Sequence, residues 1–198
     1  MSARPKTVLT ATPEEEAAII AAVRAAQGHT VAGPEHVDDL VALLADPAVS
    51  GPIYDLPRPV NRETVGQWVA DSEALRQQGR CILSLSFDAA GAVAGYSRFT
   101  VWPERSSAEL AGARRADLQN TGSGRQGVAR SIAWMFEALG VRLIGLTAAL
   151  DNVRSAKAID GAGFKRMGEV ESVRPDGTLR RSLYWELTRD EWVRRHRL

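Results

Sequence analysis

The spacing of apolar residues changes near residue 80, and this change limits the fold more than any other feature of the sequence. Before residue 80, apolar side chains recur every three or four positions, which is typical of helices with one buried face. Helices are predicted over about 13–27, over 35–46 and from Asn61 to beyond Leu75. After residue 80, polar and apolar positions alternate over 81–87, which predicts a strand. Both periods in one chain predict a mixed α/β fold.

The order of the later segments narrows the topology. Strands are expected over 7–12, 81–87, 92–102, 107–114, 141–150, 167–173 and 179–187, and further helices over 125–139 and 152–162. Residues 81–114 then form an antiparallel meander, a strand–helix–strand unit follows, and a hairpin closes the chain around the Pro175–Gly177 turn. We expect a mixed, mostly antiparallel central sheet with flanking helices. No repeat or long linker divides the chain, so 1–198 is predicted to be one domain, with the least specific pattern over 1–60.

Composition removes several classes of function. The 25 basic and 24 acidic residues give a net charge of +1, so a general electrostatic attraction to nucleic acid is not expected. Cys81 is the only cysteine, and no Cys/His spacing suggests a metal site. The amino-terminal residues lack an apolar signal core. The most apolar long stretch, 131–150, contains Glu137 and Arg142, so it does not suit a bilayer. A soluble cytoplasmic protein is expected.

A glycine-rich stretch lies between a predicted strand and the helix at 125, and one interpretation of it is a nucleotide site. Gly122, Gly124 and Gly127 spell G-x-G-x-x-G, the dinucleotide fingerprint. That fingerprint normally follows a buried parallel strand early in a large doubly wound sheet, and here only about 70 residues follow it. A dinucleotide-binding oxidoreductase is therefore the lesser alternative. A P-loop does not fit, because Val128 and Ala129 stand where Lys and Ser/Thr are needed.

The stretch 119–124 also fits Q/R-x-x-G-x-G/A, and with it the chain resembles the GNAT superfamily of acyl-CoA-dependent N-acetyltransferases. Three further segments carry the resemblance: Ala108-Glu109-Leu110 upstream, the DNxxS segment at 151–155, and Gly163-Phe164. The closing segment 174–192 resembles the branch that acetylates protein N-termini, including ribosomal-protein acetyltransferases. The resemblance implies acetyl-CoA as cosubstrate and acetyl transfer to an amine.

The resemblance also implies which residues bind the cosubstrate. In the family this loop holds the pyrophosphate of coenzyme A. Unpaired N–H groups and the positive dipole end at a helix N-terminus suit that charge, and glycine lets the backbone approach it. Asn152 and Ser155 match the family positions near the pantetheine or phosphate, although Asn152 also fits a plain helix N-cap. The loop residues that match are Gln119, Asn120, Thr121, Gly122, Ser123, Gly124 and Arg125.

Direct attack of an amine on the thioester needs a base and a donor for the oxyanion. Glu109 is the first candidate base, on the strand that enters the loop, with a solvated strand carboxylate as the alternative. Asp117 is a weaker candidate. A backbone N–H near Ala113–Ala116 is expected to face the oxyanion.

The acid that protonates the departing thiolate has no assignment. Many family members carry a tyrosine on the helix after the DN motif, and Ile159 stands there in this sequence. Tyr184 and Tyr96 are possible substitutes that match no family motif. This departure keeps open a non-catalytic acyl-CoA-binding module as an alternative function.

The acceptor is expected to be a primary amine of low pKa. At pH 7, deprotonation costs roughly 1 kcal/mol for an α-amine and about 4–5 kcal/mol for lysine. A site without a strong acid/base pair therefore favours a peptide or protein α-amine, and a small-molecule amine remains open. The edge of the last hairpin could pair with a second copy as a homodimer.

Overall fold

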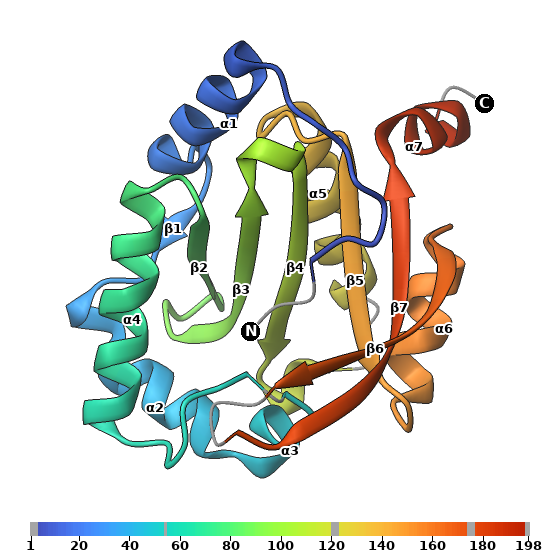
Figure 1. Cartoon of the computed structure of the whole chain (residues 1–198). Coiled ribbons are helices and arrows are strands. Elements are labelled where there is room, and N and C mark those ends of the chain that lie inside the picture. Colours follow the sequence, from blue (N-terminus) through green and yellow to red (C-terminus); the bar gives the residue numbers. More distant parts are fainter. Residues whose placement is uncertain (1–3, 54, 120–122, 174–176, 197–198) are drawn as a thin grey trace.

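The computed structural model describes residues 4–53, 55–119, 123–173 and 177–196 (Figure 1). The strands are β1 (Thr30–Val31), β2 (Cys81–Phe87), β3 (Val93–Trp102), β4 (Ser107–Arg114), β5 (Leu143–Ala149), β6 (Lys165–Val173) and β7 (Leu179–Thr188). The α-helices are α1 (Pro13–Ala25), α2 (Val37–Ala45), α3 (Pro47–Ser50), α4 (Arg62–Gln77), α5 (Ser123–Glu137), α6 (Val153–Gly161) and α7 (Arg189–His196). The 3-10 turns are η1 (Pro34–His36), η2 (Pro103–Arg105) and η3 (Ala116–Leu118).

The strands form one seven-stranded sheet in the order β1-β2-β3-β4-β5-β7-β6. Every neighbouring pair is antiparallel except β4 with β5, which are parallel and are connected through α5. The predicted mixed, mostly antiparallel sheet with flanking helices is confirmed. In the part of the chain that the structure describes, every helix is too short or too polar to cross a bilayer.

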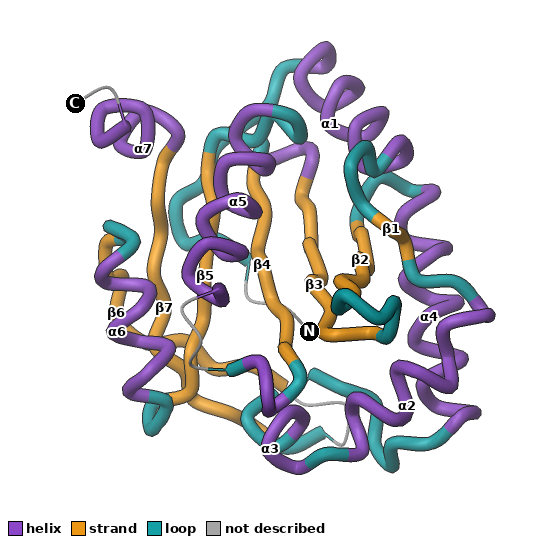
Figure 2. The backbone as a smooth tube through the Cα atoms, turned by 180° about the vertical axis from the view of Figure 1, so that it is seen from behind, coloured by secondary structure: helices purple, strands orange, loops and turns teal. Residues whose placement is uncertain are grey.

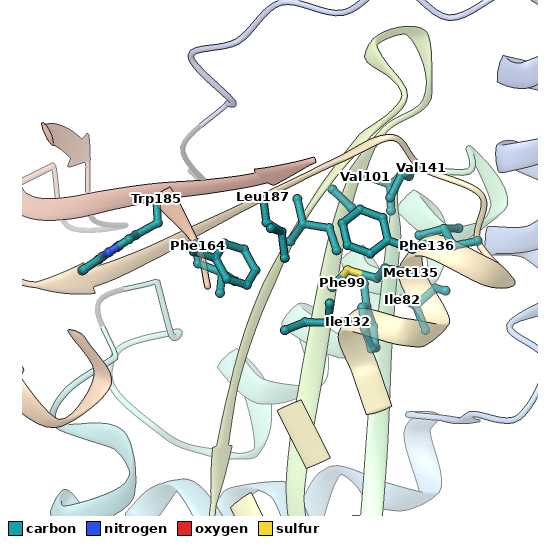
Figure 3. Packing of buried hydrophobic residues seen from close by; sticks show 14 of the residues in the cluster. Ile82, Phe99, Val101, Ile132, Met135, Phe136, Val141, Phe164, Trp185 and Leu187 are labelled. Atoms are coloured by element: carbon teal, nitrogen blue, oxygen red, sulfur yellow. The ribbon is translucent and has the colours of Figure 1, made fainter. Parts of the chain in front are cut away.

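The larger hydrophobic core lies on the sheet face that α5 and α6 cover, the near face in Figure 2. Ile132, Met135 and Phe136 of α5 pack there against Phe99 and Val101 of β3, as Figure 3 shows. The predicted inward positions of β7 are confirmed, because Trp185 and Leu187 of β7 are buried in the same cluster. Trp185 also donates its Nε1–H to Asp160 Oδ1 of α6 at 2.8 Å, which ties this helix to the sheet.

A second core covers the opposite face at the β2–β3 end. It joins α2 and α4 to the sheet through buried side chains, among them Leu40, Leu44, Val65, Val69, Leu83, Leu85 and Tyr96. Asn61 begins α4 as predicted, with its Oδ1 accepting the Thr64 N–H at 2.9 Å. This second face therefore has helical cover only over part of its width, and β4, β5 and β7 carry polar side chains where the cover ends.

The strand predicted over 7–12 was wrong. Residues 5–12, which we call the N-terminal strap, cross the face opposite α5 without joining the sheet (Figure 1). The backbone of the strap bonds to side chains and to the Glu104 carbonyl: Arg105 donates to Pro5 O at 2.8 Å, Arg142 donates to Thr10 O at 2.6 Å, and the Ala11 N–H donates to Glu104 O at 3.0 Å. Its backbone groups are thereby satisfied outside the sheet.

Two other elements differ from the sequence prediction. Residues Thr30–Val31, expected in a loop, pair with β2 as a two-residue edge strand. Helix α7 was not predicted, although Thr188 and Glu191 carry the signature of a capping box. In the structure the Thr188 N–H donates to Glu191 Oε2 at 3.0 Å and the Glu191 N–H donates to Thr188 Oγ1 at 3.3 Å.

Candidate active site

The two central parallel strands separate halfway along their length. Their pairing runs from Ser107↔Leu143 to Glu109↔Gly145, whereas β4 continues to Arg114 and β5 to Ala149. Figure 1 shows the strands diverging beyond these pairs. Gly112 is exposed although β4 lies in the middle of the sheet. The splay therefore opens the sheet at its centre.

The backbone of β4 offers amides to this opening. Arg115 donates its N–H to Ala94 O of β3 at 2.9 Å, and β4 remains paired with β3 up to Gly95↔Arg114. Because amide directions alternate along an antiparallel strand, those of Leu110, Gly112 and Arg114 point toward the β5 side. The last β4–β5 pair uses that of Leu110, so Gly112 is the first whose amide faces the opening. Within the range Ala113–Ala116 expected for the oxyanion donor, the Ala113 amide points to β3 and the Arg115 amide bonds to Ala94 O, whereas the Arg114 amide points to the β5 side.

Glu109 lies at the point where the strands separate. It is buried with 4% of its surface exposed, and it stands on the face opposite α5. Thr147 of β5 donates its hydroxyl to Glu109 Oε1 at 3.1 Å. The carboxylate is thus held by a residue of the neighbouring strand, at the last row before the opening. Thr147 was missed in the sequence, because only the register between the two strands places it beside Glu109.

Tyr184 and Glu186 of β7 continue this polar row. Gly145 is in register with Glu109 on one side and with Glu186 on the other. The Tyr184 hydroxyl fills the space above Gly145, only 2.4 Å from where a Cβ would stand, and donates to Glu186 Oε1 at 3.1 Å. Burial, and then the charge of Glu186, raise the pKa of Tyr184. A buried phenol of this kind is a poor acid for a departing thiolate.

The other two candidates for proton transfer are placed unfavourably. Burial raises the pKa of Tyr96, which lies in the second core with its ring edge-on to Trp68 at 5.3 Å between centroids. Asp117 accepts from Arg115 Nε at 2.8 Å, and this hydrogen bond lowers the pKa of the Asp117 carboxyl. A carboxyl with a lowered pKa is a weaker base. Neither residue adds a group to the row around Glu109.

The structure describes only part of the loop that is predicted to bind the cosubstrate. Asn120, Thr121 and Gly122 lie outside the described residues, and α5 begins at Ser123, so Ser123, Gly124 and Arg125 form its first turn. Gln119 precedes them and donates its side-chain amide to Arg114 O at 2.9 Å. The loop therefore connects the open end of β4 to the N-terminus of α5.

Asn152 caps α6. Its Oδ1 accepts the Ser155 N–H at 3.0 Å, which confirms the capping alternative and orders the turn that follows β5. Ile159, one helical turn beyond Ser155, packs against the core of the α5 face. An apolar side chain suits that packing, which gives a structural reason for the missing tyrosine.

A buried ion pair borders the same sheet face as Glu109. Arg98 of β3 is in register with Ala111 of β4, and its Nη1 lies 3.6 Å from Asp55 Oδ2. Both side chains are mostly buried, with 18% and 15% of the side chain exposed. Asp55 belongs to the irregular segment 51–60. This segment therefore reaches the sheet face next to the opening, on the side away from α5.

One parallel strand pair joined through α5, in an otherwise antiparallel sheet with flanking helices, is consistent with the fold that the resemblance to acyl-CoA-dependent N-acetyltransferases implied. A GNAT acetyltransferase domain model matches residues 31–165, more than half of the chain, and the protein therefore belongs to the GNAT acetyltransferase family. A single parallel pair also disfavours the doubly wound dinucleotide alternative.

Solved structures of low sequence identity share this fold. The ribosomal-protein-S5-alanine acetyltransferase from Vibrio fischeri is 16% identical with a TM-score of 0.68, over 82% of this chain and 93% of that one. The ribosomal-protein-alanine N-acetyltransferase from Brucella melitensis is 19% identical with a TM-score of 0.61, over 80% and 98%. The microcin C7 self-immunity acetyltransferase MccE, solved with acetyl-CoA and AMP, is 14% identical with a TM-score of 0.67, over 81% and 91%. No match was found among curated proteins.

Proposed function

We propose that the protein is an acetyl-CoA-dependent N-acetyltransferase that transfers the acetyl group to a primary amine by direct attack on the thioester. One observation carries the proposal: the buried Glu109 carboxylate, oriented by Thr147, stands where β4 and β5 separate. An amine entering from the face opposite α5 meets a positioned base there. The thioester enters between the strands.

The chemistry balances with these groups. The amine nitrogen forms a bond to the carbonyl carbon, the C–S bond breaks, and the sulfur leaves as a thiolate that takes up a proton. Glu109 accepts the proton of the attacking ammonium, directly or through water. The N–H of Gly112, which lies past the last β4–β5 pair and points to the β5 side, suits an oxygen of the pantetheine arm or the carbonyl oxygen as it gains charge.

The cosubstrate's phosphates are proposed to lie at the N-terminus of α5. Gln119, Ser123, Gly124 and Arg125 flank or form that terminus, and Asn120, Thr121 and Gly122 complete the loop. Asn152 and Ser155, which begin α6 on the other side of the splay, are proposed to contact the pantetheine arm.

The acceptor is proposed to be a peptide or protein α-amine. An α-amine requires little free energy for deprotonation at pH 7, and the described residues around Glu109 include no strong acid. Neighbours of similar fold include two ribosomal-protein alanine acetyltransferases, and the Arg98–Asp55 pair lines the side from which an acceptor would enter.

Equilibrium binding and thiol release test the proposal together. Wild-type protein is expected to bind acetyl-CoA with a Kd of about 1 μM, near −8 kcal/mol, and to release coenzyme A when an α-amine peptide is added. Gly122→Val should abolish binding, because a β-branched side chain blocks the approach of the phosphates. Unchanged affinity in a folded Gly122→Val variant would contradict the loop assignment. Binding without transfer to any amine would identify a non-catalytic acyl-CoA-binding module.

A further inference from the structure

The second buried carboxylate on the catalytic face, Glu186, has no role in the reaction as derived so far. It is only 4% exposed, and it accepts hydrogen bonds from three donors. Tyr184 donates its hydroxyl to Oε1 at 3.1 Å, Thr7 donates its N–H to Oε1 at 3.0 Å, and Thr7 donates its hydroxyl to Oε2 at 2.5 Å. A buried carboxylate with charge-assisted bonds of this kind is rigidly held.

Two of these three donors come from the N-terminal strap, about 180 residues earlier in the sequence. The strap is itself anchored on both sides of Thr7. Arg105 donates to Pro5 O and to Thr7 O at 2.8 and 3.2 Å. Lys6 donates its Nζ to Met167 O and Glu169 O at 2.8 and 3.0 Å, and lies 5.9 Å from the centre of the Tyr184 ring. The strap therefore holds Tyr184 and Glu186 in place from the sheet face opposite α5.

This assembly adjoins Glu109. Glu109, Gly145 and Glu186 form one row across β4, β5 and β7, so the two carboxylates stand two strand spacings apart, ~10 Å between Cα atoms. The Tyr184 hydroxyl occupies the space over Gly145, between them. Glu109 is close enough to Tyr184 for its charge to act on the phenol. On its β5 side, Glu109 is thus bounded by Thr147 and Tyr184.

A phenol has one proton to donate. In this structure that proton goes to Glu186, so it is not directed at Glu109. A second donor on the Glu109 carboxylate, in addition to the orienting Thr147 hydroxyl, would stabilise its charged form further and weaken it as a base. The charged group that accepts the phenol proton is Glu186, and the ammonium of Lys6 lies over the Tyr184 ring.

We propose that Glu186, Tyr184 and Thr7 are positioning residues for Glu109, so that one residue of the N-terminal strap, Thr7, serves the reaction. This inference rests on the proposed acetyltransferase function. The three residues lie outside residues 31–165, the stretch that the family model matches, and the inference therefore stands on the contacts of this chain. Thr7 acts through Glu186, Glu186 acts by holding the Tyr184 hydroxyl, and Tyr184 keeps the space beside Glu109 filled.

A double-mutant cycle on the full chain tests this proposal. Thr7→Val and Glu186→Gln are made alone and in the Glu109→Gln background, and kcat for an α-amine peptide is measured with acetyl-CoA affinity. Alone, each is expected to lower kcat about tenfold, since small displacements of a catalytic group have effects of this size or larger. Acetyl-CoA affinity should stay within about twofold. In the Glu109→Gln background the further loss should vanish, because residues that act as a unit are not additive.

Two matched variants separate positioning from folding. Thr7→Ser keeps both donors and should retain kcat within about twofold of wild type. Val8→Ala changes the neighbouring strap residue, whose side chain is 73% exposed, and should leave kcat unchanged. If Glu186→Gln fails to fold, the comparison of Thr7→Val with Thr7→Ser still tests the proposal.

Each outcome decides the question. Equal losses with and without the Glu109 carboxylate, or no loss in Thr7→Val, would overturn the positioning role while leaving the acetyltransferase proposal intact. A wild-type protein that binds acetyl-CoA and acetylates no amine would overturn both.

Discussion

The hydroxyl of Thr147 on β5 donates to the buried carboxylate of Glu109 on β4, across the two strands at the row where their pairing ends. Beyond that row the strands diverge, and the amide of Gly112 points into the opening. The bond therefore links the proposed base to the place where the thioester is proposed to lie. Removing it leaves the carboxylate buried with one donor fewer, which is the basis of the first prediction.

Thr147→Val should lower kcat about tenfold, with little change in acetyl-CoA affinity. Loss of a hydrogen bond to a charged group costs about 1.5–3 kcal/mol, and 1.4 kcal/mol corresponds to a factor of ten. Steady-state kinetics with a peptide acceptor checks this expectation. Thr147→Ser keeps the donor and should stay near wild type. If Val and Ser behave alike, Thr147 contributes packing rather than orientation.

Glu109→Gln should lower turnover about 10- to 1000-fold at neutral pH, in the range of general-base contributions. The loss should shrink as the pH rises above the pKa of the acceptor amine, about 7.7–8.0 for an α-amine, because the free amine needs no base. A pH profile of kcat/KM for both proteins measures this convergence. Equal activity at pH 7 would show that the proton leaves by another route.

Gly145→Ala should destabilise the fold, because the new Cβ would lie 2.4 Å from the Tyr184 hydroxyl oxygen. Overpacking of this kind costs about 1–3 kcal/mol. Tyr184→Phe removes the closest atom, although Cε2 and Cζ remain at 3.2 Å. The double variant should therefore lose less stability in urea unfolding than the sum of the single variants. Additive losses would place the strain elsewhere.

Gly127→Ala is the matched control for that experiment. No atom lies within 4 Å of the Cβ that alanine would add there in α5. It should leave stability unchanged or raise it by up to about 1 kcal/mol, because alanine is the better helix former.

Acid should weaken the fold through His29. Its Nδ1 lies 2.9 Å from Ser84 Oγ, and its ring packs edge-on against Trp134 and Phe99 with centroids 4.4 and 5.1 Å away. Burial lowers the pKa of His29 in the folded state, so the unfolded chain binds the proton more readily. The stability that neutral His29 contributes is complete above the ordinary histidine pKa of about 6.5. It is lost as the pH falls toward the lower pKa that His29 has in the folded protein.

Urea unfolding at about pH 7.5 and about pH 5.5 measures this effect. Wild type should lose more stability between these two pH values than His29→Phe, which keeps an aromatic ring and cannot titrate. An equal pH dependence of the two proteins would assign the acid sensitivity to other groups.

The alternation of Leu83 and Leu85, and the helical spacing of Ile132, Met135 and Phe136, were enough to predict the meander, α5 and the class of fold. Local capping signals placed α4 and α6 through Asn61 and Asn152. The strap could not be predicted in this way, because TVLTAT has strand composition and its partners, Glu186 and Arg105, are remote in sequence. Strand propensity was overridden there by side-chain bonds to the backbone.

The candidate site, too, was predictable only where its residues carry a local sequence signature. Glu109 and the glycine loop have local signatures, and they were found from the sequence alone. Thr147, Tyr184 and Glu186 meet Glu109 only through the registers of β4 with β5 and of β5 with β7, which no local pattern encodes. The amide directions of β4 likewise depend on its pairing with β3, so the sequence could not single out the amide that faces the opening.

The most direct measurement of the central claim is acetyl transfer from acetyl-CoA to matched peptides, followed by mass spectrometry and thiol release. One set has free N-termini and no lysine, and the other has blocked N-termini and one lysine. The account predicts faster transfer to the free N-termini, with coenzyme A released in equal amount and with transfer strongly reduced in Glu109→Gln. Faster transfer to the blocked lysine peptides, or release of coenzyme A without an acetylated product, would contradict it.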